Sequence, residues 1–296
     1  MVYTVTFNPA IDYIAQADSI TFGDTNRSYG EEIYFGGKGI NVSCILKELD
    51  TDTTALGFIA GFTGEALENH LKNRGIKTDF VKLQKGFTRI NVKLKGDEIT
   101  EINGAGPEIT KEDLDALFLK LEKISKGDTL VLSGSIPKCL PEDIYEQIMG
   151  RLTKRGIRFV VDAEGDLLLN TLKYKPFLIK PNLAEISAIF KKELKNNDEI
   201  ISAAKEFQNM GAENVIVTMG SKGAVLLDEN GNITERAAYK INAVNTVGAG
   251  DSMVAGFLAG IENGYEFALD SGIAAATATA GSMGLATAKE IALYLA

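Results

Sequence analysis

The chain has 296 residues, of which 45% are hydrophobic and 24% are charged, a balance that fits a globular enzyme in water. Its formal net charge of −9 argues against a nucleic-acid-binding protein, because there is no basic surplus to neutralise phosphates. No apolar run reaches the ~20 residues of a membrane span, and residues 1–8 begin a strand rather than a basic-then-apolar leader. We therefore expect a cytoplasmic protein that binds neither nucleic acid nor a membrane.

The first element is a predicted strand from Val2 to Phe7, which is rich in β-branched and aromatic residues. It stops at Asn8-Pro9, since proline cannot continue the ladder. Asp12 follows four residues after Asn8. An acid just beyond the carboxyl end of a strand lies where α/β proteins place ligand contacts, so Asp12 is a candidate binding residue.

Two segments, from about 12 to 35 and from about 86 to 103, are predicted to be strand pairs outside the main sheet. Each consists of short runs with partial alternation, divided by Gly23-Asp24 or by Gly96-Asp97. Together they would form a small lid sheet. Alternation places Ile90, Val92 and Leu94 on one face, which must be covered by the core or by a second subunit.

A first candidate anion loop lies between these pairs, where Gly36, Gly37, Lys38 and Gly39 precede an apolar-periodic helix from Val42 to Leu49. It is not a Walker A loop, because the glycine and lysine spacing of that motif is absent from the chain. Glycine is common at ordinary turns, so this loop alone is a weak signal.

From residue 53 onward, apolar strands alternate with helices, which predicts a mostly parallel sheet covered on both faces within one domain, residues 1–296. The expected strands are centred on residues 53–60, 129–133, 158–161, 177–179 and 215–218. The expected helices include residues 64–75, 141–155 and 269–282. Ser133, Asp162, Asn182 and Gly220 lie at the carboxyl ends of expected strands and should converge on one crevice with Asn8.

Three residues with reactive side chains carry little signal. Cys44 and Cys139 lack metal-ligand spacing and are expected to be free thiols. The single histidine, His70, sits in a polar helical run and is expected to be an ordinary surface residue, because partners for a triad or a metal site are absent.

The second anion loop, Asn245 to Ser252, follows a strand-like run and precedes an apolar segment of small residues, Met253 to Gly260. A helix that starts here would direct unpaired N–H groups and its positive dipole end outward. Asp251 lies within this loop, either as a base for a group that attacks a bound phosphoryl or as a helix-capping aspartate. The loop by itself does not decide between the two.

Together these loops resemble the two signatures of the ribokinase-like (PfkB) carbohydrate kinase family. The resemblance spans the whole chain, because further family-like segments follow in order: residues 6–12, 134–137, 180–185 and 220–223. Residues 8–12 and 88–93 are most similar to the branch that contains 1-phosphofructokinases and tagatose-6-phosphate kinases, and closest to the former. The resemblance implies a three-layer α/β/α ribokinase-like core, a β-sheet lid that is often shared in a homodimer, and use of ATP with Mg²⁺.

The resemblance also implies roles for individual residues. Asp251 would be the catalytic base, and the amides of Gly248, Ala249 and Gly250 would stabilise the transferred group. Asn182 and Glu185 would hold Mg²⁺ through its waters. The nucleotide would contact the residues around a glycine loop: Thr218, Gly220, Ser221, Lys222 and Gly223.

The sugar phosphate would be held by a separate set of residues. Asp12 would accept hydrogen bonds from sugar hydroxyls. Lys38 and Arg89 would hold the substrate's own phosphate, with Arg27 on a lid strand as a third cation, in its own subunit or across a dimer. The remaining expected contacts are Gly36, Gly37, Asn41 and Ser135.

The implied reaction is ATP-dependent phosphorylation of a ketohexose phosphate, with fructose 1-phosphate as the expected substrate and fructose 1,6-bisphosphate as the product. Kinases of tagatose 6-phosphate or fructose 6-phosphate are the alternatives within the family. A sugar-phosphate sensor without catalysis is a third possibility, which the intact Asp251 loop disfavours. A nucleoside kinase fits less well, because its substrate has no phosphate for Lys38 and Arg89 to hold.

Overall fold

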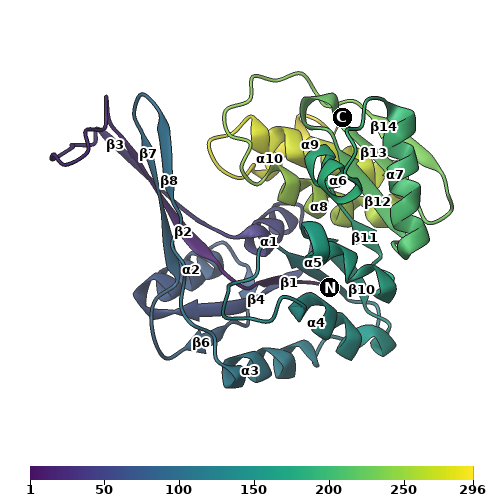
Figure 1. Cartoon of the computed structure of the whole chain (residues 1–296), viewed down its shortest axis with the longest axis horizontal. Coiled ribbons are helices and arrows are strands. Elements are labelled where there is room, and N and C mark those ends of the chain that lie inside the picture. Colours follow the sequence, from purple (N-terminus) through teal and green to yellow (C-terminus); the bar gives the residue numbers. More distant parts are fainter. Residues whose placement is uncertain (296) are drawn as a thin grey trace.

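The central element of this computed structural model is a ten-stranded sheet with the order β14-β13-β12-β11-β10-β9-β1-β4-β5, in which β6 also pairs with β4 (Figure 1). The structure describes residues 1–295, so residue 296, the last of the expected domain, lies outside the described residues. The strands are β1 Val2–Thr6, β4 Thr53–Ala60, β5 Lys77–Thr78, β6 Val81–Leu83, β9 Thr129–Ser133, β10 Arg158–Asp162, β11 Leu178–Ile179, β12 Asn214–Thr218, β13 Ala224–Leu227 and β14 Ile233–Arg236.

The strands from β12 to β5 pair in parallel, as the sequence predicted, and those from β12 to β4 are almost entirely buried on both faces. Alternate residues point to opposite sides. Leu130, Leu132 and Phe159 pack into one buried cluster, whereas Val131 and Val160 pack into another. A sheet that buries both faces needs helices on both sides.

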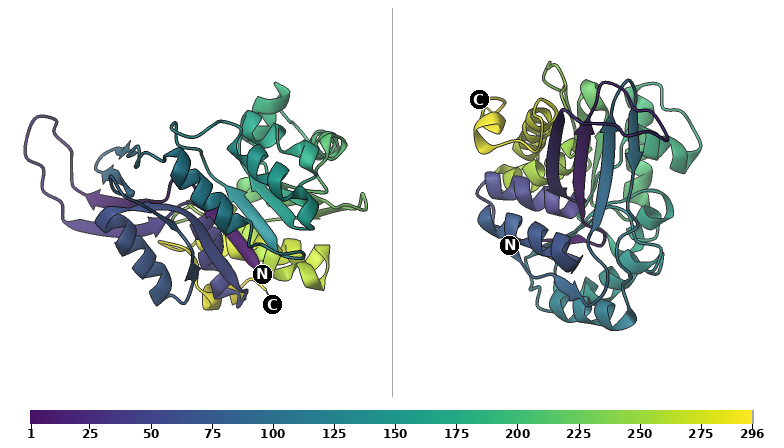
Figure 2. Two further views of the ribbon diagram at one scale, coloured as in Figure 1. Left: turned by 90° about the horizontal axis from the view of Figure 1, so that it is seen from below. Right: turned by 90° about the vertical axis from the view of Figure 1, so that its left-hand side faces the viewer.

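Two helical layers supply that cover, so the expected three-layer α/β/α core is confirmed (Figures 1 and 2). One layer comprises α3 Lys111–Leu121, α4 Ile144–Leu152, α5 Gly165–Leu169, α6 Leu183–Phe190 and α7 Asn197–Met210. The other comprises α1 Lys38–Glu48, α2 Gly61–Asn73, α8 Ala249–Gly260, α9 Tyr265–Ala280 and α10 Ala288–Ala292.

The lid is a separate four-stranded sheet that projects from the core, with the order β3-β2-β7-β8 (Figures 1 and 2). Its strands are β2 Ala10–Gln16, β3 Gly30–Gly36, β7 Arg89–Lys95 and β8 Ile99–Ile102. β2 and β7 run parallel, and the two outer pairs are antiparallel. Both expected lid segments therefore contribute two strands each.

The register gives the lid two chemically different faces. Asp12 pairs with Asn91 and Tyr34, which places polar side chains on one face. The other face is apolar and consists of Ile11, Tyr13, Ile33, Phe35, Ile90, Val92, Leu94 and Ile102. Its outer residues Ile33 and Ile102 keep more than half of their surface exposed, at 57% and 58%.

Several sequence expectations were wrong in detail. Arg27 lies in the exposed connection between β2 and β3, not on a lid strand. The core sheet ends in two antiparallel strands, β13 and β14, that alternation of strand and helix did not predict. No strand leads directly into the Asn245 loop, because residues 237–248 are irregular.

His70 is half-buried rather than an ordinary surface residue, and its ring stacks on Phe35 of the lid with 4.6 Å between ring centroids. Phe35 comes from a strand that only the tertiary fold brings beside α2. Cys44 is buried and Cys139 exposed, and both are free. Among residues 1–295, no helix is long and apolar enough to cross a membrane.

Candidate active site

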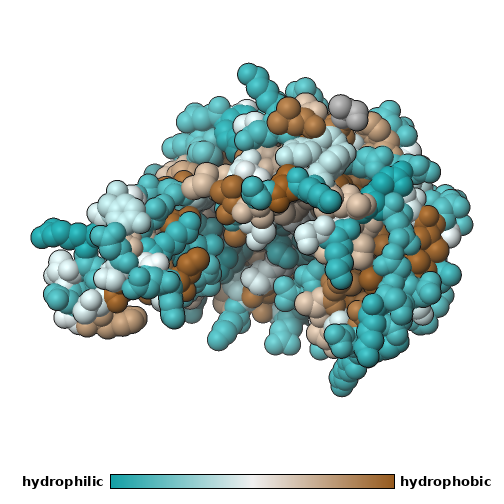
Figure 3. All heavy atoms as spheres, turned by 90° about the horizontal axis from the view of Figure 1, so that it is seen from above, coloured by the Kyte–Doolittle hydropathy of each residue, from teal (hydrophilic) through white to brown (hydrophobic). Residues whose placement is uncertain are grey.

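A large cleft of about 1140 Å³ lies at the carboxyl ends of the core strands, beneath the lid. The surface is recessed between the projecting lid and the core (Figure 3). The strand ends meet here because β1 and β9 are neighbours at the point where the strand order reverses. Most expected site residues line this cleft: Asp12, Gly37, Lys38, Asn41, Arg89, Ser135, Asn182, Glu185, Thr218, Gly220, Ser221, Gly223, Gly248, Ala249, Gly250 and Asp251. Gly36, Lys222 and Arg27 do not line it.

The Asn245 loop ends at the amino terminus of α8. Gly248 adopts the left-handed conformation with φ of 83°, which glycine reaches without strain, and helix α8 begins at Ala249. The first intrahelical bond is Ser252 N to Gly248 O at 2.8 Å, so the amides of Gly250 and Asp251 precede the ladder. The loop therefore has the geometry of an anion site.

Asp251 is buried beside this site, with only 5% of its surface exposed. It does not cap the helix: its Oδ2 accepts a hydrogen bond from Asn41 Nδ2 at 2.8 Å. Burial, reinforced by the nearby charge of Asp162, raises the pKa of Asp251 to about 7, although Asn41, Lys38 and Lys180 oppose the rise. A carboxylate poised near neutral pH suits proton transfer.

Asp162 bridges two lysines close to this carboxylate. Its oxygens lie 3.6 Å from Lys38 Nζ and 3.2 Å from Lys180 Nζ, and both Asp162 and Lys180 are buried. Burial alone would lower the pKa of Lys38, but the carboxylates of Asp162 and Asp251 outweigh it and raise that pKa. Lys180 Nζ also lies 3.3 Å from the point where Gly250 would carry a Cβ.

Arg89 and Asp12 occupy the opposite end of the cleft, at the base of the lid. The Arg89 side chain donates through Nε to the backbone oxygen of Asn8 at 3.2 Å. Burial lowers the pKa of Arg89, and Asp12 opposes this. Asp12 accepts a hydrogen bond from Asn91 Nδ2 at 2.7 Å. The pKa of Arg89 thus depends on the Asp12 carboxylate, whereas the pKa of Lys38 depends on those of Asp162 and Asp251.

Asn182 and Glu185 cap the start of α6 reciprocally. Asn182 Oδ1 accepts from Glu185 N at 2.9 Å, and Glu185 Oε2 accepts from Asn182 N at 2.9 Å. Burial is the main cause that raises the pKa of Glu185. Among residues 1–295, no group of three or more His, Cys, Asp or Glu side chains forms a metal cage. A single carboxylate beside an amide fits a hydrated magnesium ion, which keeps most of its water ligands.

The part of the cleft between the glycine loop and α9 is apolar on one side. Ile273, Ala276, Thr277 and Ala280 of α9 line it at helical spacing, opposite Gly220 and Gly223. Gly220 begins a short 3₁₀ turn, Gly220–Lys222, directly after β12. The family resemblance identified this glycine loop but not its apolar counterpart on α9.

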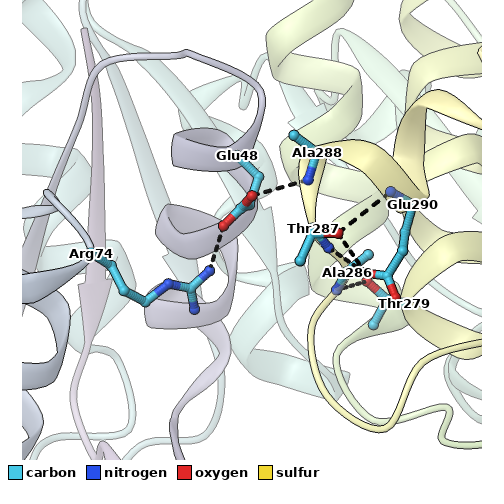
Figure 4. Close-up of polar contacts among 7 residues, drawn as sticks. All are labelled: Glu48, Arg74, Thr279, Ala286, Thr287, Ala288 and Glu290. Carbon is cyan, nitrogen blue, oxygen red and sulfur yellow. Dashed lines mark hydrogen bonds and ion pairs between the residues drawn. The ribbon is translucent and has the colours of Figure 1, made fainter.

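The connection between α9 and α10 packs against the Gly248 turn, where a Cβ on Gly248 would lie 2.7 Å from the Leu285 side chain. Thr279 Oγ1 accepts from Ala286 N at 3.2 Å and bonds Ser252 Oγ at 2.8 Å. Figure 4 shows the outer support: Glu48 of α1 accepts from Ala288 N at 3.0 Å and from Arg74 at 2.8 Å. The Gly248 turn is thus supported by the α9–α10 connection, which is itself held by Glu48 of α1.

Sequence reasoning missed Asp162 and Lys180 as site residues. Asp162 was expected to reach the crevice but was given no role there, and Lys180 was not singled out. Both lie directly at or after the carboxyl end of a parallel strand. The convergence of such ends was the available signal. The ion pairs that distinguish them connect residues far apart in the sequence.

The sequence profile of pfkB family carbohydrate kinases matches residues 4–292. A 1-phosphofructokinase of Bacillus subtilis is 44% identical over 294 residues, covering 97% of this chain and 95% of that protein. A D-tagatose-1-phosphate kinase of Bacillus licheniformis is 38% identical over 288 residues, covering 96% and 94%.

Solved structures agree with the fold. Phosphofructokinase-2 of Escherichia coli in complex with substrates and products has a TM-score of 0.92 at 29% identity, covering 99% of this chain and 98% of that one. The same protein has been solved in a tetrameric inhibited form. A Thermotoga maritima ribokinase, 22% identical with a TM-score of 0.80 and covering 100% and 99%, shares the fold. The chain therefore belongs to the pfkB family of carbohydrate kinases.

Proposed function

We propose that this protein transfers the γ-phosphoryl group of ATP to fructose 1-phosphate and forms fructose 1,6-bisphosphate. Membership of the family implies ATP use and, typically, a divalent metal ion. The observation that carries the proposal is a cleft with a buried carboxylate and an anion loop at one end and an arginine–aspartate pair at the other. The similarity to a 1-phosphofructokinase at 44% identity supports the choice of sugar.

Asp251 is proposed as the base. It would accept the proton of the sugar hydroxyl as that oxygen attacks the γ-phosphorus of ATP and the bond to the β-phosphate oxygen breaks, releasing ADP. The hydrogen bond from Asn41 would orient the carboxylate. Its raised pKa matches a proton acceptor that works near neutral pH.

The charge on the transferred group is proposed to be stabilised by fixed donors at the α8 terminus. The amides of Gly248 and Gly250 would supply neutral donors with the positive end of the helix dipole behind them, whereas the Ala249 amide already donates to Thr246 O at 3.3 Å. Lys180, held by Asp162 next to Gly250, would add a buried positive charge. Lys38 was expected to hold the substrate's own phosphate. Because it shares Asp162 and lies in the field of Asp251, we propose instead that it contacts phosphate oxygens near Asp251.

The sugar phosphate is proposed to bind beneath the lid. Arg89 would grip its phosphate through the guanidinium nitrogens that remain free of the Asn8 contact. Asp12 would accept hydrogen bonds from sugar hydroxyls. Gly36, Gly37, Asn41 and Ser135 are proposed as further contacts at the mouth of α1 and the end of β9.

The nucleotide is proposed to lie between the glycine loop and α9. Thr218, Gly220, Ser221 and Gly223, which line the cleft, would contact the nucleotide, and the apolar side chains of α9 would pack against the adenine ring. Lys222 lies in the same loop outside the cleft lining and would reach the phosphates from there. Mg²⁺ would be held through its waters by Glu185 and Asn182, and when bound it supplies neutralising charge on the ATP phosphates. The residues of this proposed site belong to one domain, residues 1–296.

We also propose a homodimer joined through the lids. Support comes from the apolar lid face, whose Ile33 and Ile102 stay exposed in the single chain. A second lid packed on this face would cover both. Arg27 lies beyond the open end of the lid and does not line its own cleft, which favours a contact with the partner's substrate.

The test is a coupled ADP-release assay with fructose 1-phosphate, tagatose 6-phosphate and fructose 6-phosphate side by side. Tagatose 1-phosphate is included because a relative at 38% identity is named for it. We expect the highest kcat/KM with fructose 1-phosphate. A higher value with another sugar would reassign the substrate within the family, and no ADP release with any of them would favour the sensor alternative.

A further inference from the structure

A polar strap ties the lid sheet to the core directly above the sugar-phosphate end of the cleft. We define it as Asn8, at the end of β1, Asn91, on β7, and the segment Gly104–Gly106 that leaves β8. Asn8 was expected at the crevice but was given no role, Asn91 was not singled out, and both line the cleft. The two asparagines have in common that each contacts a residue proposed to bind the sugar phosphate: Asn91 contacts Asp12, and Asn8 contacts Arg89.

Asn91 makes two hydrogen bonds with its buried amide, which is only 8% exposed. Its Nδ2 donates to Asp12 Oδ1 at 2.7 Å, and its Oδ1 accepts from Gly104 N at 3.2 Å. Asp12 and Asn91 face each other across the parallel β2–β7 pair, so the contact fixes the carboxylate on the cleft face. A donor to a carboxylate limits its rotation.

Asn8 makes the equivalent connection from the core. Its Nδ2 donates to Ala105 O at 3.1 Å, and its backbone oxygen accepts from Arg89 Nε at 3.2 Å. Gly106 has φ of 87°, and a Cβ there would lie 2.4 Å from Asn8 Oδ1, so the segment can approach this closely only as glycine. One segment therefore supports both asparagines.

We propose that Asn91 and Asn8 are positioning residues for the sugar phosphate. Asn91 sets the Asp12 carboxylate for the sugar hydroxyls. The Asn8 side chain holds the strap at Ala105, and this keeps in place the Asn8 backbone oxygen that binds Arg89, so Asp12 and Arg89 keep their spacing. This inference rests on the proposed sugar-phosphate roles of Asp12 and Arg89. It adds that the spacing of Asp12 and Arg89 is set by Asn91 and Asn8, which act on the sugar phosphate only by way of these two residues.

The test compares Asn91→Asp, Asn91→Ala and Asn8→Ala in the full-length protein. Asn91→Asp keeps the acceptor for Gly104 but replaces the donor to Asp12 by a second carboxylate. Gln16→Ala is the matched control. Gln16, on lid strand β2, also donates through its side-chain amide to a carboxylate, that of Glu32 on β3, at 2.8 Å, and it does not line the cleft. Thermal melting of each variant reports whether it is folded.

We expect Asn91→Asp to raise the KM for fructose 1-phosphate about tenfold or more, because a hydrogen bond to a charged group is lost and replaced by repulsion. Asn91→Ala and Asn8→Ala should raise it by about three- to tenfold. The KM for ATP should stay within about twofold in all three, which a merely unfolded or loosened protein would not show. Titration calorimetry with fructose 1-phosphate should give the same order of affinities.

The inference is overturned if Asn91→Asp leaves the sugar-phosphate KM unchanged while Asp12→Asn raises it. It is also overturned if both KM values rise together, or if Gln16→Ala matches Asn91→Ala. Should Asp12→Asn and Arg89→Ala leave the sugar-phosphate KM unchanged, the proposed sugar site itself is wrong, and the positioning role falls with it. ADP release with ketohexose phosphates would then still test the overall reaction separately.

Discussion

At the Asp251 end of the cleft, Asp162, Lys180 and Asp251 are almost fully buried in the core, whereas the polar side chains of the lid lie on a thin sheet whose other face is partly open. The core groups hold one another through ion pairs and a helix terminus. The lid groups are held by single hydrogen bonds to amides and to one backbone oxygen.

This difference suggests a division of labour. Buried charges in a packed core cannot rearrange cheaply, so they suit a transition state that needs fixed electrostatics. Groups on a projecting sheet can be moved with that sheet and suit recognition of one particular sugar. The following experiments test this division, and they run from the largest expected effect to the smallest.

The largest effect is expected for Asp251→Asn, which removes the proposed base but keeps its size. We expect kcat to fall by about 10²- to 10⁴-fold, because a positioned general base contributes about that much. ATP affinity, measured by calorimetry, should be retained. A kcat close to that of the wild type would show that the core end does not supply the base.

Arg89→Ala should act on recognition instead. Loss of a charged pair with the substrate's phosphate should raise the KM for fructose 1-phosphate by about 10- to 100-fold. The KM for ATP should be unchanged, because Arg89 lies at the other end of the cleft. The KM of Arg89→Lys for fructose 1-phosphate should lie between those of the wild type and Arg89→Ala, since lysine keeps the charge but cannot bind phosphate with two parallel hydrogen bonds. An unchanged sugar KM in Arg89→Ala would reduce Arg89 to a structural lid residue.

The open lid face gives a prediction about assembly. Ile102→Asp places a charge on the apolar face, so we expect a shift from dimer to monomer in light scattering after size exclusion. Ile99→Asp is the control, because Ile99 is on the same strand and 66% exposed but points to the opposite face. Equal behaviour of the two variants, or a monomeric wild type, would contradict assembly through this face.

The smallest effect concerns stability and pH. The folded-state pKa of Asp251, about 7, lies above its ordinary value of 3.8, so this group costs stability as pH rises between the two values. Asp251→Asn does not titrate and should melt at a temperature higher than the wild type at pH 8, by a few degrees. At pH 4 the gain should disappear. A gain that is independent of pH would show that the carboxylate is not held under strain in the core.

Much of the fold could be predicted because it depends on local patterns. Apolar strands such as residues 129–133 need burial on both faces, and this alone indicates a parallel sheet between helices. The Gly248 turn and the Lys38 loop could likewise be recognised from residue type and spacing. The convergence of strand ends then predicted that Asn8, Ser133, Asp162, Asn182 and Gly220 would meet, and they line one cleft.

The layers, the lid strands and most lining residues could therefore be predicted, because each follows from the period or the conformation of a short segment. Other features depend on how the chain folds back on itself: the Asp162–Lys180 pair, the Asn8 and Asn91 strap, the apolar wall of α9 and the stacking of His70 on Phe35. These are contacts between segments far apart in the chain. Their energy depends on distance and burial in three dimensions, which no local pattern encodes.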